Sequence, residues 1–278
     1  MNRKTEKKLD KLLDNTLDLA LKRRAKWLIE NLNPQDGDKI LDVGCGDGYY
    51  LFLLSNLGLD LELVGIDNDV NALKPARQNI KGRKVKLLYG DLMKRLPLKS
   101  NSFDKIVMSE VLEHLPNDFK GLSEVRRVLK PDGVIAISVP NYNFPFLWDP
   151  LNWVLQYIFK THIKSGFWAG IWSQHIRLYR PKEIKKVTEK AGFKIKKVYI
   201  QTFWSIPFNH NLINLGARIL TKNSSKTLFS GVNKFKIEEK KSFIAYLYFY
   251  LTNFVDKLNE IWMPEDIGVS IVVIAKRA

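Results

Sequence analysis

A glycine-rich turn directly after an apolar run constrains this chain more than any other feature. The sequence ILDVGCGDGYY, residues 40–50, places glycines at 44, 46 and 48 behind a predicted buried strand. This G-x-G-x-G spacing differs from the G-x-G-x-x-G of dinucleotide-binding proteins, and it lacks the Gly-Lys-Ser/Thr of a P-loop. Asp42 would repel a pyrophosphate but attract an ammonium group. The turn therefore suits a ligand with an amine and a carboxylate, the carboxylate lying at the N-terminus of the following helix.

Two further acids follow the next predicted strands. Asp67 ends LELVGID, 21 residues after Gly46, at a position where a carboxylate can accept both hydroxyls of a ribose. Asp91 follows VKLLYG and can accept a hydrogen bond from an adenine amino group. An amino acid, a ribose and an adenine together predict S-adenosylmethionine as the cofactor. The alternatives are a turn without a ligand for the glycines, a helix N-cap for Asp67 and a solvated turn acid for Asp91.

Strands and helices alternate along the first half of the chain. Short apolar runs separated by helical stretches predict a parallel sheet with helices on both faces. With two later strands included, the sequence predicts an α/β, Rossmann-like fold with seven strands and an aromatic-rich cap made by two insertions. The expected segments are an N-terminal helical segment (1–34), a cofactor-binding core (35–140), an aromatic insertion (141–175), a core helix and strand (176–201), a second insertion (202–265) and a final core strand (266–278).

Four motifs occur in a fixed order, namely ILDVGCGDG, VGIDND, LLYGDLMKRLPLKSNSFDKIVMSEVLEHL and VRRVLKPDGVIAISVPN. On these motifs the chain resembles the class I S-adenosylmethionine-dependent methyltransferases, most of all the subgroup with quinone-biosynthesis and other small-molecule enzymes. The resemblance is tight over residues 35–140 and resumes weakly at HIRLYRPKEIKKVTEKAGFKI. It implies contacts to the methionine part from Asp42, Gly44 and Gly46, to the ribose from Asp67 and Asn68, to the adenine from Asp91 and Leu92, and to the sulfonium side from Ser109.

Carboxylates and an imidazole follow the fourth predicted strand, beside the expected position of the methyl group. Glu110, Glu113 and His114 lie in SEVLEHLP, and such a grouping can bind a metal or act as a base. We favour a structural hydrogen-bonded cluster here and predict no metal. His175 joins the aromatic insertion to the core, and a structural role is an equal alternative for it. For an acceptor hydroxyl that needs a base, we predict His114 and His175 as the catalytic residues.

The second half of the chain is basic and aromatic. Residues 141–278 contain 21 Lys and Arg against 9 Asp and Glu, a net charge of +12, whereas residues 1–140 contain 24 against 20, a net of +4. Of 32 aromatic residues, 25 lie after position 140. Aromatic side chains favour an apolar acceptor body, and the positive charge favours an anionic group. We predict a small amphiphilic or lipid-like acceptor methylated on oxygen or carbon, such as a quinone precursor, a lipid-linked glycan or an isoprenoid.

The same composition also suits a single-stranded nucleic acid, so an RNA methyltransferase is the alternative. Against it, the fourth strand ends in SEVLEHLP, not in the Asn/Asp-Pro-Pro-aromatic motif that holds a base amine. The stretch WDPLNWVLQYIFK predicts a helix with Trp148 or Leu151, Leu155 and Ile158 on one face, which fits a membrane surface or the cover of a pocket. A regulator that binds the cofactor without catalysis is disfavoured by the intact motifs.

Other features limit the environment of the protein. Cys45 is the single cysteine, which excludes an internal disulfide and a Cys-rich zinc site. No apolar run reaches the length of a membrane span, and the N-terminus MNRKTEKKLDKLLDNTLDL has no secretion signal. We therefore expect a cytoplasmic protein whose basic aromatic cap makes peripheral contact with the inner face of the membrane.

Overall fold

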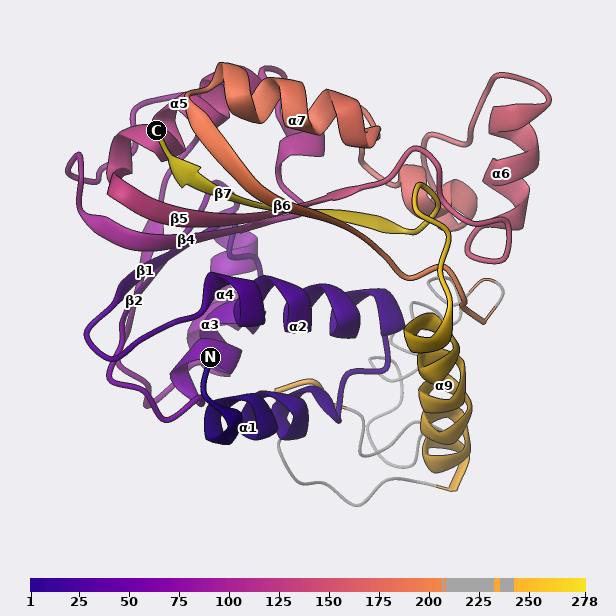
Figure 1. The fold of residues 1–278 in the computed structure, drawn as a ribbon, viewed down its shortest axis with the longest axis horizontal. Helices are drawn as coiled ribbons and strands as arrows, with labels where there is room; N and C mark the ends of the chain where they lie inside the picture. The colour runs from indigo at the N-terminus through magenta and orange to yellow at the C-terminus, as the bar shows by residue number, and fades with distance from the viewer. Residues whose placement is uncertain (207, 209–232, 236–242) are drawn as a thin grey trace.

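Seven strands form one sheet in the computed structural model, which describes residues 1–206, 208, 233–235 and 243–278. The strand order is β3-β2-β1-β4-β5-β7-β6 (Figure 1). The strands are β1 (Lys39–Val43), β2 (Glu62–Asp67), β3 (Val85–Tyr89), β4 (Phe103–Ser109), β5 (Leu129–Pro140), β6 (Phe193–Gln201) and β7 (Ser270–Arg277). The predicted seven-stranded, Rossmann-like sheet is confirmed.

The first five strands are parallel, so their carboxyl ends lie along one edge of the sheet. Asp42 pairs with Gly65 between β1 and β2, and Asp67 pairs with Tyr89 between β2 and β3. Loops that follow neighbouring parallel strands meet at this edge, which is where open α/β sheets bind ligands. The acids that the sequence places at strand ends are therefore close in space.

Helices cover both faces of the sheet, as predicted (Figure 1). Those of the core are α1 (Arg3–Leu13), α2 (Leu19–Leu32), α3 (Tyr49–Ser55), α4 (Val70–Asn79), α5 (Asp118–Val128) and α7 (Pro181–Lys190). One hydrophobic cluster joins α5 and α7 to one face of the sheet, and a second joins α1, α2 and α3 to the other. Alternation along β1 explains this, because Leu41 belongs to the first cluster and Ile40 to the second.

The structure differs from the sequence prediction in two elements. The N-terminal helical segment is two helices, since the Asp18 side chain accepts a hydrogen bond from the Leu21 amide and begins α2 separately. The sheet is mixed and not wholly parallel, because β7 runs antiparallel to both β5 and β6. Ser270, the first residue of β7, pairs with Pro140 at the end of β5. The chain thus enters β7 from the carboxyl edge of the parallel strands and has to run in the opposite direction.

The aromatic insertion packs beside this edge as a small third core. It contains α6 (Pro150–Tyr157) and the 3-10 segment η2 (Phe167–Trp172), and its cluster includes Phe144, Trp148 and Trp172. The buried Asp149 carboxylate accepts hydrogen bonds from the Asn152 side chain at 2.8 Å and from the Ile171 amide at 3.1 Å. These bonds connect the two ends of the insertion.

Of the two alternatives that the sequence leaves for one helix face, Trp148 or Leu151, the structure places Leu151 beside Ile158 on the exposed side. Trp148 precedes α6 and is only 4% exposed, whereas Leu151 and Ile158 are exposed at 37% and 63%. The indole of Trp148 therefore stabilises the insertion from inside and is not available to a membrane.

Half of the second predicted insertion, 202–265, lies outside the described residues. Its described part includes α9 (Phe243–Ile261), which stands beside the N-terminal end of α2 in Figure 1. The Arg23 guanidinium of α2 pairs with the Asp256 carboxylate of α9 at 2.5 Å. Within the described ranges, no helix is both long enough and apolar enough to cross a membrane.

Truncation of Trp148 tests the core of the insertion. We expect Trp148→Ala to lower the free energy of unfolding by about 3–5 kcal/mol, because removal of a buried aromatic side chain loses apolar contacts and enlarges a cavity. Trp168 of the same insertion is 52% exposed, so Trp168→Ala should cost less than about 1 kcal/mol. Urea unfolding measures both variants. Equal losses would show that Trp148 is not a core residue.

Candidate active site

The glycine turn after β1 has a different requirement at each glycine. Gly44 and Gly46 have φ of +68° and +51°, which favour glycine. A Cβ on Gly44 would lie 2.4 Å from Cγ2 of Val111, whereas a Cβ on Gly46 would meet no atom within 4 Å. Gly44 is therefore needed for close packing against the segment after β4. Gly46 borders open space in which a ligand can approach the backbone.

Asp42 is a buried acid without a compensating charge nearby. It is 1% exposed, and its Oδ2 has no hydrogen-bond partner among the described residues. Burial raises the pKa of Asp42 well above its ordinary value, and the carboxylates of Asp67 and Asp47 raise it further. A buried carboxylate without a partner is costly. The ammonium group of the predicted cofactor would supply the missing charge, so the residue fits the group that the sequence assigns to it.

Asp67 connects the glycine turn to the end of β2. Its Oδ2 accepts a hydrogen bond from the Gly46 amide and its Oδ1 accepts one from the Asp69 amide, both at 2.8 Å. The N-cap of α4 is Asp69, whose side chain accepts from the Asn71 amide. The N-cap alternative for Asp67 is therefore wrong. Each carboxylate oxygen keeps a lone pair that can accept a ribose hydroxyl, and Asn68 beside it is exposed.

Asp91 and Leu92 lie after β3 in a tight turn. The Asp91 Oδ1 accepts a hydrogen bond from the Met93 amide at 2.8 Å, as in an Asx-turn. The Leu92 side chain is 6% exposed and belongs to the core cluster that α5 covers. This hydrogen bond supports the alternative that Asp91 is a turn residue. The other carboxylate oxygen, Oδ2, can still accept a hydrogen bond from an adenine amino group.

A chain of hydroxyl groups crosses the ends of β4 and β5. The Ser109 Oγ lies 2.9 Å from both the Tyr50 hydroxyl and the Ser138 Oγ, and Ser138 donates to Glu110 Oε1 at 3.0 Å. Burial raises the pKa of Tyr50, so its phenol is neutral. Glu110 also pairs with the Arg24 guanidinium at 3.5 Å. This network holds Ser109 and Glu110 in place at the carboxyl edge of the sheet.

A pocket of about 300 Å³ opens between the core and the aromatic insertion. Its walls combine apolar and ionisable side chains from segments that are distant in the sequence. The lining residues are Asp18, Ala20, Arg24, Glu110, His114, Pro140, Trp148, Gly170, Ile171, Ser173, Gln174, His175 and Val269. The structure thus brings His114 and His175, the two predicted bases, to the wall of one pocket.

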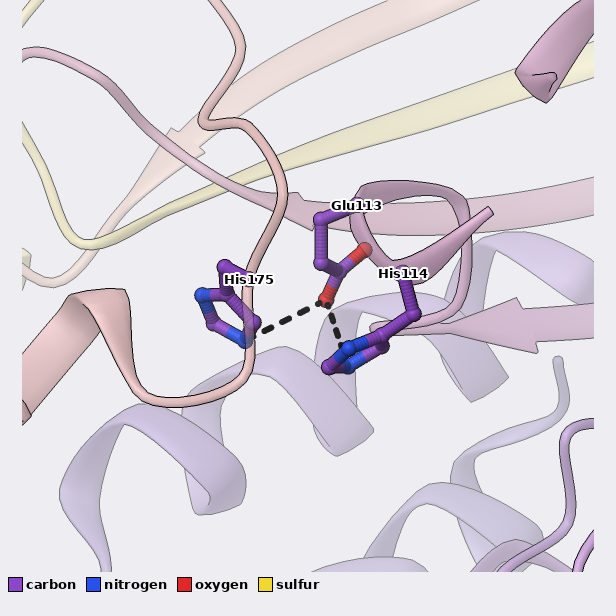
Figure 2. A group of neighbouring side chains, drawn as sticks. All are labelled: Glu113, His114 and His175. Atoms are coloured by element: carbon purple, nitrogen blue, oxygen red, sulfur yellow. Dashed lines mark ion pairs between the residues drawn. The ribbon is translucent and has the colours of Figure 1, made fainter. Parts of the chain in front are cut away.

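Glu113, His114 and His175 form a compact cluster at this wall (Figure 2). The Glu113 Oε1 lies 3.9 Å from the Nε2 of each histidine. The side chain of Glu113 is fully buried, whereas those of His175 and His114 are 15% and 38% exposed. Burial raises the pKa of Glu113 well above its ordinary value, and the nearby Glu110 raises it further. These separations are too long for direct hydrogen bonds. Of the predicted hydrogen-bonded cluster of Glu110, Glu113 and His114, only the Glu113 carboxylate has no hydrogen-bond partner among the described residues, whereas Glu110 accepts from Ser138 and His114 bonds to the Gln174 carbonyl.

Backbone contacts hold the cluster from outside. The His114 Nδ1 lies 3.0 Å from the Gln174 carbonyl oxygen, which can only accept, so Nδ1 carries the proton and Nε2 has a free lone pair. The Ile176 amide donates to the Glu113 carbonyl at 3.0 Å. Glu110 and Gln174 both have positive φ, 55° and 63°, and such strained residues concentrate at functional sites.

Sequence reasoning missed several residues of the site. Arg24 and Asp18 come from the start of α2, far from any motif, and Tyr50 and Ser138 supply the hydroxyl network. Arg23 and Arg24 lie among apolar residues of a predicted amphipathic helix, and a charged residue in such a position indicates a buried partner. Their partners lie more than 80 residues away, so the pattern alone could not identify them.

Comparison with known proteins gives one consistent result. Residues 34–194 match the family described as "Methyltransferase domain". The demethylmenaquinone methyltransferase of Geobacillus kaustophilus is 34% identical, over 66% of this chain and 84% of that protein. The demethylmenaquinone methyltransferase of Staphylococcus aureus is 31% identical, over 60% of this chain and 73% of that protein.

Solved structures share the fold at lower identity. An S-adenosylmethionine-dependent methyltransferase from Thermotoga maritima has a TM-score of 0.55 and 17% identity, covering 94% of this chain and 91% of that one. Another from Archaeoglobus fulgidus has a TM-score of 0.51 and 19% identity, covering 91% of each chain. At these identities the likeness concerns the fold alone.

Replacement of Asp42 by asparagine should separate binding from stability. The pKa of Asp42 is higher in the folded state than in the unfolded state, so ionisation of this carboxyl destabilises the folded state. The destabilisation is absent below the unfolded pKa of about 3.9 and grows as pH rises toward the folded pKa. At neutral pH, Asp42→Asn should therefore raise the unfolding midpoint by at least about 2 °C. It should also weaken S-adenosylhomocysteine binding at least tenfold, since a charge-assisted hydrogen bond contributes about 1.5–3 kcal/mol.

Scanning calorimetry at pH 4 and pH 7.5 and titration calorimetry measure the two effects. Asp60→Asn is the matched control, because Asp60 is an exposed aspartate outside the glycine turn and does not contribute to the raised pKa of Asp42. A variant that is no more stable than the wild-type chain and binds with unchanged affinity would contradict the role of Asp42.

Proposed function

This chain belongs to the class I S-adenosylmethionine-dependent methyltransferases, and we propose that it methylates an oxygen or carbon atom of a small amphiphilic acceptor with a quinone-like ring. The observation that carries the proposal is the pocket beside Ser109 and Glu110. Its lining combines apolar side chains such as Trp148, Ile171 and Val269 with ionisable ones such as Arg24 and Glu110. Such a combination suits a ring that is apolar on its faces and polar at one edge.

The cofactor would lie along the carboxyl edge of the sheet. S-adenosylmethionine supplies an electrophilic methyl group on its sulfonium. We assign its contacts to Asp42, Gly44, Gly46, Asp67, Asn68, Asp91, Leu92 and Ser109. The unpartnered Asp42 oxygen and the open space at Gly46 support this assignment.

The acceptor class rests on two supports. The relatives that cover most of the core are named demethylmenaquinone methyltransferases, and quinols of that kind combine an aromatic ring with an apolar tail. Arg24, which is 13% exposed and paired with Glu110, places a positive charge at the pocket for an acceptor hydroxyl or enolate.

The two pocket histidines would act on the acceptor. A phenol or enol becomes a strong nucleophile only when it loses its proton, and an imidazole within hydrogen-bond reach can accept that proton. His114 and His175 both line the pocket. The remaining contribution is alignment of acceptor and donor, which can supply about 7–11 kcal/mol of the barrier.

The outer face of the aromatic insertion would contact a lipid surface. Its exposed apolar side chains share one segment of the chain: Phe146, Leu151, Ile158, Phe159 and Trp168 are exposed at 48%, 37%, 63%, 66% and 52%. Lys160 and Lys164 lie among them. Apolar insertion together with basic charge favours an anionic membrane, which is where an acceptor with an apolar tail would be dissolved.

Filling the pocket tests the acceptor site. We expect Ser173→Trp to lower kcat/KM for a prenylated 1,4-naphthoquinol at least tenfold, because the indole would occupy acceptor space. Affinity for S-adenosylhomocysteine should change less than twofold. Ser165→Trp is the matched control, since Ser165 is an exposed serine of the same insertion that does not line the pocket. Methylation of RNA with no turnover of any quinol would replace this proposal by the nucleic-acid alternative.

Vesicle sedimentation tests the lipid contact separately. Wild-type protein should co-sediment with phosphatidylglycerol-containing vesicles at low salt and much less with pure phosphatidylcholine, because each basic residue near an anionic surface contributes about 1 kcal/mol. Ile158→Asp with Phe159→Asp should reduce binding at least tenfold. Phe119→Ser, on α5 away from the insertion, is the control. Equal sedimentation of both variants would exclude this face as the contact.

A further inference from the structure

Glu113, His114 and His175 present three metal-ligating atoms to one point beside the pocket (Figure 2). We propose that these three side chains bind a divalent transition-metal ion, of which Zn²⁺ is the best match. Two imidazole nitrogens and one carboxylate oxygen are the ligand set of catalytic zinc sites and of non-haem iron sites. The set excludes Mg²⁺ and Ca²⁺ as the preferred ions, because those ions take oxygen ligands.

The distances between the ligand atoms suit a single ion. One atom from each side chain lies within 4.8 Å of the others, and the Glu113 Oε1 is 3.9 Å from each Nε2. Ligands that bind Zn²⁺ tetrahedrally at 2.0–2.1 Å lie about 3.4 Å apart. The ligand atoms therefore have to approach one another by about 0.5–1.4 Å to hold a tetrahedral ion.

The buried Glu113 carboxylate favours a bound cation. Glu113 is fully buried, and neither of its carboxylate oxygens has a hydrogen-bond partner among the described residues. The nearest cationic side chain of the pocket, Arg24, already pairs with Glu110 at 3.5 Å. A buried carboxylate is stable when it is paired or coordinates a metal, and the two imidazoles beside it supply neutral ligands for the same ion.

Outer contacts orient the ligands in the manner of metal sites. The His114 Nδ1 donates to the Gln174 carbonyl at 3.0 Å, which turns the unprotonated Nε2 toward the cluster. A metal-bound histidine commonly donates its other nitrogen to a carbonyl or carboxylate in this way. The segment that carries His175 is tied to the residues of the other two ligands by the hydrogen bond from the Ile176 amide to the Glu113 carbonyl.

The position of the ion would give it a catalytic use. The cluster supplies three protein ligands, and His114 and His175 line the pocket, so a fourth position would face the acceptor, as in catalytic zinc sites. A hydroxyl bound there would release its proton to solvent more readily, because the ion stabilises the resulting oxyanion, and the ion would replace the histidines as the activating group. This use rests on the proposed function, whereas binding of the ion does not.

Metal binding is tested on the full-length, tag-free chain after chelation and dialysis. We expect about one Zn²⁺ per chain by elemental analysis after equilibrium dialysis, and Co²⁺ should give the visible absorption of a low-symmetry site with nitrogen and oxygen ligands. Glu113→Gln and His175→Asn should each weaken Zn²⁺ binding at least about 100-fold, since even outer contacts contribute 10–100-fold. His162→Gln is the matched control, because the His162 ring stacks on Trp172 at 3.8 Å and is not part of the cluster.

His114→Gln is the variant least expected to disturb folding, because the His114 side chain is 38% exposed. It should weaken Zn²⁺ binding as the other two variants do. Wild-type protein that binds less than about a tenth of an equivalent of Zn²⁺ would overturn the proposal. Equal binding by all variants would overturn it too. Affinity for S-adenosylhomocysteine, measured in parallel, distinguishes the two failures: intact cofactor binding without a metal leaves the methyltransferase in place and returns the base role to the histidines.

Discussion

The hydrogen bond from the Gly46 amide to the Asp67 carboxylate links the two strand ends on which the cofactor edge depends. The amides of Gly44 and Cys45 both donate to the Ile66 carbonyl, so the turn after β1 follows the end of β2 before it departs. The positive φ of Gly44 and Gly46 allows this path. Asp67 thereby becomes a rigid acceptor that can hold a ribose, and open space remains beside Gly46.

Two buried carboxylates are held in place at a cost to stability. Asp42 and Glu113 are both essentially inaccessible, and burial raises the pKa of each. Neither is explained by the packing of the chain alone, because a buried acid without a partner destabilises a fold. Binding of a positively charged ligand would offset the cost of burying each carboxylate. On our proposals, the partner is the cofactor's ammonium for Asp42 and a metal ion for Glu113.

The pocket that we propose for the acceptor arises where the aromatic insertion meets the core. The segments of the insertion are closely packed at Asp149 and Gly170. A Cβ on Gly170 would lie 1.8 Å from the Asp149 carboxylate. The insertion supplies Trp148, Ile171 and His175 to the pocket, while α2 supplies Arg24. A general methyltransferase core can thus take different acceptors through the segments attached to it, without change in the edge that holds the cofactor.

The sequence by itself determined the sheet, the glycine turn and the acids at strand ends, because each depends on local patterns and on the rule that parallel strands end at one edge. It also identified His114 and His175 as candidate bases. Only the tertiary structure decided that Trp148 is buried, that β7 runs antiparallel, that Arg24 reaches Glu110, and that both histidines face one carboxylate. These features depend on contacts between residues far apart in the chain. Periodicity and motif spacing report only which face of an element is apolar, and not which distant side chain will meet it.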